Sequence, residues 1–208
     1  MWPDRFATRR VILAVALVGA AHAARAQVTM LDNPSFEGGS GNSIPGWSSF
    51  ENAYASNNGD EGVFDRTGTG TGVGKLYGTF SGNYGVSGFY QQFGTTPGRC
   101  YQFHVYSYQK TGDDLTTGTA DNFVLERLTF FDAGGNELTD YGVNAQILDA
   151  TFPKDTWIDN PTVTATAPAG AASVAGYILF IQPEFAGGAG FFDDAALGRK
   201  WSGKKVPI

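Results

Sequence analysis

Hydrophobic and polar side chains alternate along much of the chain beyond residue 27, which is the pattern of β-strands that bury one face. The alternation is strictest from Cys100 to Gln109, where Tyr101, Phe103 and Val105 fall on one side of the strand. These apolar residues predict a face turned toward the protein core. The other side combines polar and aromatic residues: Cys100, Gln102, His104, Tyr106 and Tyr108.

Shorter apolar runs bounded by glycine- and proline-rich turns predict the remaining strands. They lie at 27–30, 50–55, 75–78, 89–93, 123–131, 162–167, 174–182 and 191–197. Residues 67–74 alternate threonine with glycine and indicate a loop or an edge strand, and 141–152 has room for a short helical turn. About eight or nine antiparallel strands therefore predict an all-β, two-sheet β-sandwich.

The composition agrees with one β-domain. Glycine (29 residues) and aromatic residues (14%) are frequent and charged residues (16%) are few, which suits tight turns and pleated surfaces. Residues 27–198 hold 19 acidic and 6 basic side chains, so this body would repel phosphate backbones and attract divalent cations or neutral ligands. We therefore expect no nucleic acid partner, and we expect a monomer. Cys100 is the one cysteine, so no internal disulfide can form.

The first 26 residues have the features of a signal peptide. Three arginines precede the apolar run from Val11 to Ala21, and Ala24-Arg25-Ala26 is a small-x-small cleavage pattern. We expect a secreted bacterial protein, extracellular or periplasmic, with the general secretory and twin-arginine routes both open. The domain then covers residues 27–198, and 199–208 form a basic tail that we expect to be flexible. No apolar run is long enough to span a membrane comfortably.

Several short motifs occur in a set order. The chain opens with Asn33-Pro34-Ser35-Phe36-Glu37 and places Trp47 after the first loop. Gln91, the Pro97-Gly98 turn and Tyr101 follow, then Leu128-Thr129-Phe130-Phe131-Asp132-Ala133-Gly134 and finally Phe192-Asp193-Asp194-Ala195. In these motifs, over about residues 28–198, the chain resembles the jelly-roll carbohydrate-binding modules attached to bacterial xylanases and glucanases, in the galactose-binding-domain-like superfamily. The resemblance implies a jelly-roll sandwich and a structural calcium ion.

The closing strand carries two adjacent aspartates. Alternation places Asp193 on the same side as the apolar residues Phe191, Ala195 and Leu197, and a carboxylate on such a face needs a partner. The same alternation places Asp194 on the opposite side, where it would face solvent.

The resemblance places the calcium ion near Glu37, a carbonyl close to Ser35 and an aspartate of the closing strand. Calcium takes about six to eight oxygen ligands, so a carboxylate from a nearby loop is expected to join them. The predicted metal ligands are Ser35, Glu37, Asp193 and either Asp60 or Asp65.

A sugar-binding surface needs aromatic rings for the apolar faces of pyranose rings and polar groups for their hydroxyls. The polar and aromatic side of the Cys100–Gln109 strand has this mixture. The candidate ligand-binding residues are Gln102, His104, Tyr106 and Tyr108 on this strand, with Tyr77, Tyr84, Tyr90 and Arg127 from neighbouring strands and loops. The alternative is that several of these tyrosines are core residues with satisfied hydroxyls.

Catalytic motifs are sparse. His104 is the one histidine outside the leader and no Gly-x-Ser-x-Gly motif is present, which argues against a Ser-His-Asp hydrolase and against a zinc site. A glycosidase with paired carboxylates stays open. We therefore expect a secreted, non-catalytic module that binds a polysaccharide or oligosaccharide. The alternatives are a structural matrix protein of the same fold and a glycan lyase or hydrolase.

These three hypotheses predict different surfaces. Sugar binding predicts an open groove with parallel aromatic rings around Tyr106 and Tyr108, whereas a matrix protein predicts that this face is covered or flat. An enzyme needs two carboxyl groups, or a tyrosine with an arginine or lysine, converging in the groove.

Overall fold

A computed structural model of the protein describes residues 29–57, 59–68, 70–115 and 121–200. The predicted signal peptide at 1–26 and residues 201–208 of the predicted tail lie outside the described residues. Within the described ranges, no helix has the length and apolarity that a membrane span requires.

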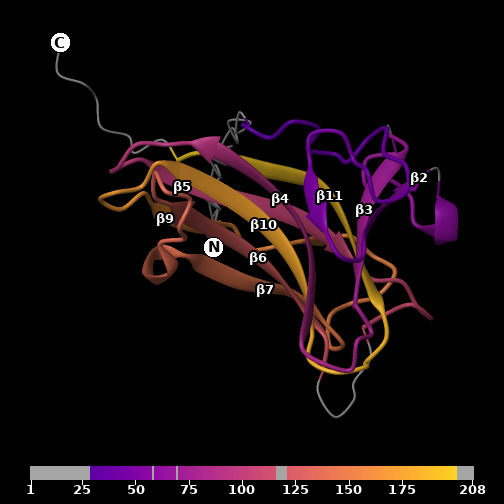
Figure 1. Ribbon diagram of the computed structural model, residues 1–208. Coiled ribbons are helices and arrows are strands. Elements are labelled where there is room, and N and C mark those ends of the chain that lie inside the picture. The colour runs from indigo at the N-terminus through magenta and orange to yellow at the C-terminus, as the bar shows by residue number, and fades with distance from the viewer. Residues whose placement is uncertain (1–28, 58, 69, 116–120, 201–208) are drawn as a thin grey trace, which may run out of the picture.

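Eleven antiparallel strands build two sheets in the described part of the chain. The first sheet has the order β1-β4-β10-β6-β7 and the second has the order β2-β3-β11-β5-β8, with β9 also paired to β5. Figure 1 shows β4, β10, β6 and β7 side by side in one layer. The strands are β1 (Ser48–Phe50), β2 (Ala53–Asn57), β3 (Gly72–Tyr77), β4 (Gly85–Gly94), β5 (Cys100–Tyr108), β6 (Phe123–Phe131), β7 (Val143–Asp149), β8 (Ile158–Asp159), β9 (Val163–Thr166), β10 (Ser173–Gln182) and β11 (Ala189–Arg199).

The predicted all-β, two-sheet sandwich is confirmed. Eight of the nine predicted strands are present, but Thr29 and Met30, the described residues of the strand predicted at 27–30, form no strand. Three observed strands were not predicted: β7, and also β1 and β8, which have only three and two residues, too few to show a period of two. The helical turn expected within 141–152 is wrong, since most of that segment forms β7. Short 3₁₀ turns occur instead at η1 (Asp60–Gly62) and η2 (Thr139–Tyr141).

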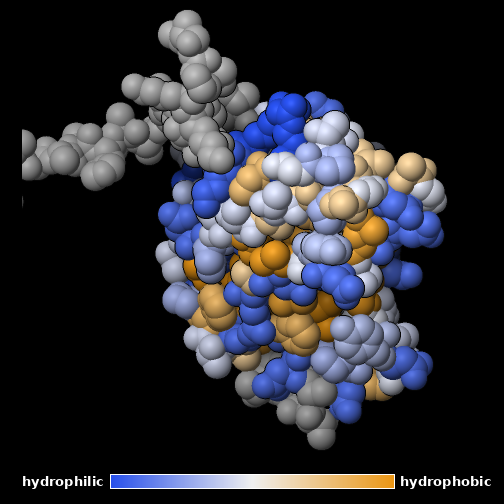
Figure 2. All heavy atoms as spheres, turned by 90° about the vertical axis from the view of Figure 1, so that its left-hand side faces the viewer, coloured by the Kyte–Doolittle hydropathy of each residue, from blue (hydrophilic) through white to orange (hydrophobic). Residues whose placement is uncertain are grey.

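The core lies between the two sheets, and β5 contributes to it as predicted. Tyr101, Phe103 and Val105 are fully buried. The opening motif closes one part of this core, because the ring of Phe36 stacks on Trp47 at 4.5 Å with an interplanar angle of 13°. Figure 2 shows the molecule from the side that lies on the left in Figure 1. In the middle of this face, hydrophobic residues are visible between hydrophilic ones.

The threonine–glycine stretch is not an edge strand. Its second half begins β3, which lies inside the second sheet between β2 and β11. A Cβ on Gly72 would lie 2.5 Å from the carbonyl oxygen of Phe36, and one on Gly74 would lie 2.9 Å from the Phe36 ring. Glycine is therefore needed here for close packing of the opening motif against β3.

The closing strand departs from regular alternation at its aspartates. A β-bulge shifts the register between Asp193 and Ala196, and Asp194 has a positive φ of 45°. The extra residue places Asp193 on the outer face with Phe191, while Ala195 and Leu197 pack in the core. The prediction that Asp193 shares a face with Ala195 and Leu197 is therefore wrong, whereas its place on the side of Phe191 is correct. Asp193 is fully buried.

Candidate functional site

The outer side of β5 carries the first four predicted ligand residues, but neighbouring loops cover its aromatic rings. The guanidinium of Arg66 lies 4.0 Å from the centre of the Tyr106 ring. Tyr108 packs against Trp157 with ring centres 5.3 Å apart. His104 contacts Asp159 at 2.8 Å, with its ring nearly perpendicular to Tyr106. The expected open groove with parallel rings is absent from this part of the described structure.

This covering has a physical cause in a small apolar cluster on the outer face of the second sheet. Val63, Val73, Ala189 and Phe191 are buried there, although they lie outside the main core. Burying this apolar surface requires a second layer, which the segments around η1 and Trp157 supply. Gln102 lies at the far end of the same strand face and is half-buried.

The other four predicted ligand residues are distributed over both sheets and a loop. Tyr77 lies on β3. Tyr84 is 66% exposed in the loop that precedes β4. Tyr90 and Arg127 belong to β4 and β6 of the first sheet, so they cannot join the β5 face.

On the first sheet, four side chains form a row that crosses four strands. The register pairs Tyr90 with Tyr177, Tyr177 with Arg127, and Arg127 with Asn144. We call these four residues the tyrosine row. The two tyrosine rings are nearly parallel, at 18°, with centres 5.0 Å apart. The two rings therefore stack on each other, and the row continues on the Tyr177 side with the hydrogen-bonding side chains of Arg127 and Asn144.

The charged end of the tyrosine row is held in place by polar contacts. Arg127 donates from Nη1 to Asn144 Oδ1 at 2.8 Å and from Nε to Glu137 Oε1 at 3.1 Å. Thr129 donates to the same Glu137 oxygen at 2.7 Å. Burial raises the pKa of Tyr177, with Tyr90 adding to the effect, so the Tyr177 hydroxyl stays a donor at neutral pH. This arrangement can stack a ring and bond its substituents.

The sequence alone did not identify Tyr177, because it lies in a strongly apolar strand. The alternation along β10 could have identified it. Ile178 and Phe180 point to one side of the strand and are fully buried, whereas Tyr177 points to the other side. A tyrosine at the opposite parity is expected to face outward.

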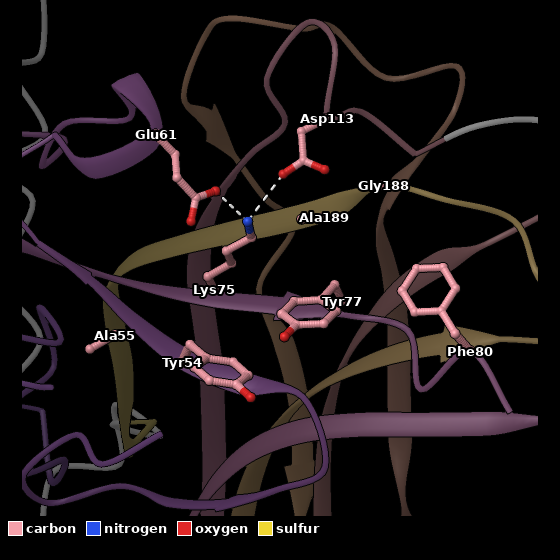
Figure 3. Close-up of a pocket in the computed structure, with 9 residues that line it drawn as sticks. All are labelled: Tyr54, Ala55, Glu61, Lys75, Tyr77, Phe80, Asp113, Gly188 and Ala189. Carbon is pink, nitrogen blue, oxygen red and sulfur yellow. Dashed lines mark hydrogen bonds and ion pairs between the residues drawn. The ribbon is translucent and has the colours of Figure 1, made fainter. Parts of the chain in front are cut away.

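The second sheet has a pocket of about 340 Å³ at its β2–β3 end (Figure 3). The rings of Tyr54 and Tyr77 stack there at 14° with centres 5.5 Å apart. Lys75 lies between two carboxylates, pairing with Glu61 and, at 3.1 Å, with Asp113 (Figure 3). The lining residues are Tyr54, Ala55, Glu61, Lys75, Tyr77, Phe80, Asp113, Gly188 and Ala189.

The groups that an enzyme would need converge in this pocket rather than on β5. Two carboxylates, a lysine and tyrosines are all present. Burial, and then the hydrogen bond with Tyr54, raise the pKa of Tyr77 to about 12. Because Lys75 ties both carboxylates to one ammonium group, the arrangement favours binding over proton transfer.

The predicted metal ligands lie around the β11 bulge. Glu37 accepts hydrogen bonds at its Oε2 from the backbone of Thr71 at 2.8 Å and Gly72 at 3.1 Å, while its Oε1 is buried without a hydrogen-bond partner. A Cβ on Gly70 would overlap this Oε1 and lie 3.0 Å from Asp65 Oδ1. The Glu37 and Asp65 carboxylates therefore face the same point.

Asp193 completes this region from the closing strand. It is fully buried, and burial raises its pKa to about 7 although the backbone N–H of Arg66 donates to its Oδ2 at 2.9 Å. Asp194 does not face solvent alone as expected, because it pairs with Arg66 at 2.5 Å and accepts from Ser35 Oγ at 2.8 Å. Asp60 is exposed on η1 and makes none of these contacts.

A hard cation such as calcium binds oxygen atoms, and carboxylate oxygens without a hydrogen-bond partner are suitable ligands. Oε1 of Glu37 is the clearest example in this region. In the part of the chain that the structure describes, no three His, Cys, Asp or Glu side chains are grouped closely enough to hold a metal ion by themselves. A cation here would therefore need backbone carbonyl ligands as well.

Comparison with known proteins identifies similar folds. No family model matches the chain, and neither does any curated protein sequence. Among solved structures, the carbohydrate-binding module TmCBM61, in complex with β-1,4-galactotriose, has a TM-score of 0.50 at 16% identity, over 83% of this chain and 99% of its own. A cyclase from Fischerella sp. has a TM-score of 0.55 at 15% identity, over 83% of this chain and 95% of its own.

A third similar structure is the enzymatically active domain of tailspike protein 4 from bacteriophage CBA120, with a TM-score of 0.56 at 15% identity. The match covers 83% of this chain but only 22% of the tailspike chain. At these identities the likeness shows the fold alone. The chain shares its β-sandwich with a carbohydrate-binding module and with enzymes.

Proposed function

We propose that this protein is a non-catalytic carbohydrate-binding domain that holds a polysaccharide or oligosaccharide on the tyrosine row. The observation that carries the proposal is the cross-strand pair of Tyr90 and Tyr177, whose rings are nearly parallel on the outer face of the first sheet. Because the rings stack on each other, a sugar ring would contact their outward edges and hydroxyl groups and the ring faces that the pair leaves uncovered.

The dimensions of the row fit a ligand longer than one sugar. Neighbouring strands are about 4.8 Å apart, so the row from β4 to β7 spans roughly 14 Å. Arg127 and Asn144 at one end can bond the ring hydroxyls, and Gln92 lies on the same face next to Tyr90. The ring of Phe50 lies over Gly88, where a Cβ would meet it at 2.6 Å, and so adds apolar surface beside Tyr90.

Affinity electrophoresis through galactan, xylan and β-glucan tests the proposal. Retardation of the wild-type protein by at least one polymer is expected, and Tyr177→Ala should weaken it at least about tenfold because one ring of the aromatic pair and its hydroxyl group are lost. Phe64→Ala is the control, since Phe64 is 66% exposed away from the row. If no polymer retards the wild type, the matrix-protein alternative replaces this proposal.

We also propose a structural calcium ion held by the carboxylates of Glu37 and Asp65 and by backbone carbonyls near Ser35, with the Asp193 carboxylate beside the site. Two observations support this ion: Oε1 of Glu37 has no hydrogen-bond partner, and Asp193 is fully buried. A divalent cation would supply positive charge that compensates both carboxylates. Such an ion would join the opening motif, the loop before β3 and the last strand.

Thermal unfolding with calcium and with chelator tests this site. The wild type should melt at a higher temperature in calcium, because an ion that binds only the folded state stabilises it. Glu37→Ala should abolish the calcium-dependent shift, whereas Glu184→Ala, at an exposed position, should retain it. Equal calcium-dependent shifts in the melting temperature of both variants would show that Glu37 is not a calcium ligand.

Export is proposed from the leader sequence alone. Cleavage after Ala26 would leave Gln27 as the first residue. Mass spectrometry of the protein released from the periplasm or medium tests this, and an intact leader on the released protein would contradict it.

A further inference from the structure

The pocket beside β2 and β3 is separate from the tyrosine row. The pocket opens on the outer face of the second sheet, and the row lies on the outer face of the first, so the core of the sandwich separates them. The two sites share no residue. A ligand on one therefore leaves the other free.

The walls of the pocket suit one ring. Stacked Tyr54 and Tyr77 form one wall, and the Phe80 ring lies 6.5 Å from Tyr77 and is 46% exposed (Figure 3). Ala189 pairs with Tyr77 in the sheet and lines the pocket beside the tyrosines, together with the preceding Gly188. A Cβ on Gly188 would overlap the carbonyl oxygen of Asp114, so this position cannot carry a larger side chain without movement.

The charged groups of the pocket present hydrogen-bond acceptors. Glu61 uses Oε2 and Asp113 uses Oδ2 to pair with the ammonium of Lys75 (Figure 3). The second oxygen of each carboxylate makes no hydrogen bond among the described residues, and both side chains are more than 40% exposed. Lys75 is the one ammonium that pairs with these carboxylates, while the Lys110 ammonium contacts the backbone carbonyl of Glu61. The second carboxylate oxygens favour hydroxyl donors, and an anion placed directly against them would meet like charge.

We propose that this pocket is a second binding site, which takes a single neutral sugar residue. Neighbouring hydroxyls of the sugar donate to the second oxygens of Glu61 and Asp113, and its apolar face contacts the tyrosine wall. A cavity of about 340 Å³ is at the small end for ligand pockets and so fits a chain end or a free monosaccharide. The choice of a sugar ligand rests on the function proposed above.

Chemical-shift mapping by NMR tests the site with galactose and glucose as probes. Binding should move the backbone amide signals of Gly188 and Ala189, in the wild type and equally in Tyr177→Ala. Glu61→Gln keeps the shape of an exposed side chain but removes a charged acceptor, and should weaken binding at least about tenfold. Galacturonic and glucuronic acids, which differ from the probes by a carboxylate, should bind at least tenfold more weakly.

The outcomes separate this site from the tyrosine row. If no polysaccharide retards the protein but the neutral sugars still move the signals of Gly188 and Ala189, the proposal for the pocket is supported. The proposal that the tyrosine row binds a polysaccharide is then refuted. If the neutral sugars leave the signals of Gly188 and Ala189 unmoved, or if the uronic acids bind as well as the neutral sugars, the proposal is overturned.

Discussion

Glu126 is a carboxylic acid in the middle of the sandwich core. It is fully buried on the inner face of β6, and neither of its oxygens has a hydrogen-bond partner. Burial raises the pKa of Glu126 to about 8 from its ordinary 4.5. The backbone amides of Val163 and Val105 lie outside hydrogen-bond geometry and offset only part of this rise. The folded protein therefore holds this side chain protonated at neutral pH.

A raised carboxyl pKa makes stability fall as the pH rises. Below pH 4.5 the side chain is protonated in both the folded and the unfolded protein, and its contribution to stability is fully present. Between pH 4.5 and 8 only the folded state keeps the proton, so the free energy of unfolding decreases. At about 1.4 kcal/mol per pH unit, the loss over this window is about 5 kcal/mol.

Glu126→Gln isolates this contribution, because glutamine has a similar shape but cannot ionise. Urea unfolding of both proteins at pH 5 and pH 8 gives the difference in their free energies of unfolding. That difference should shift by about 3–4 kcal/mol in favour of the variant between the two pH values. Other titrating groups are common to both proteins and cancel.

The control for this experiment is Glu184→Gln at an exposed position, for which the difference from wild type should stay constant with pH. A constant difference for Glu126→Gln as well would show that Glu126 is ionised in the folded protein, and would refute the reasoning.

Two further predictions concern packing and charge. Gly176→Ala should lower the free energy of unfolding by about 1–3 kcal/mol, because its Cβ would lie 2.9 Å from the buried Phe103 ring. Gly94→Ala, where a Cβ meets nothing within 4 Å, is the control in denaturant unfolding, and equal losses would contradict the packing argument. Arg66→Ala should cost about 1 kcal/mol through its partly exposed pair with Asp194, less at high salt. If the loss of unfolding free energy in Arg66→Ala does not change with salt concentration, lost packing and not the ion pair is its cause.

Part of the fold could be read directly from local patterns. The strict alternation of β5 predicted its buried side correctly, because one residue in two faces the same way in any strand. In the strand at 123–131, apolar and polar residues occur on both sides, so alternation did not predict which side is buried. The buried side contains Glu126 beside Val124 and Leu128. No local rule predicts a carboxyl group in a core.

The candidate sites show a similar division. Tyr90 and Arg127 were identified as candidates from the sequence, yet as partners of β5 rather than of Tyr177, which lies 87 positions from Tyr90 in sequence. Tyr54 was not identified from the sequence, because its role in the pocket depends on stacking against Tyr77 on the neighbouring strand. Side-chain types indicate possible chemistry, but strand order decides which of them meet.

The all-β class of the fold and the core side of β5 could both be predicted before the structure was known. These follow from periodicity and turn residues, which act over a few positions. Three features could be found only in the folded protein: loops cover Tyr106 and Tyr108, a bulge separates Asp193 from Ala195, and Tyr90 stacks on Tyr177. Each of these depends on contacts between distant segments, whose pairing is set by packing of the whole sandwich and not by any local preference.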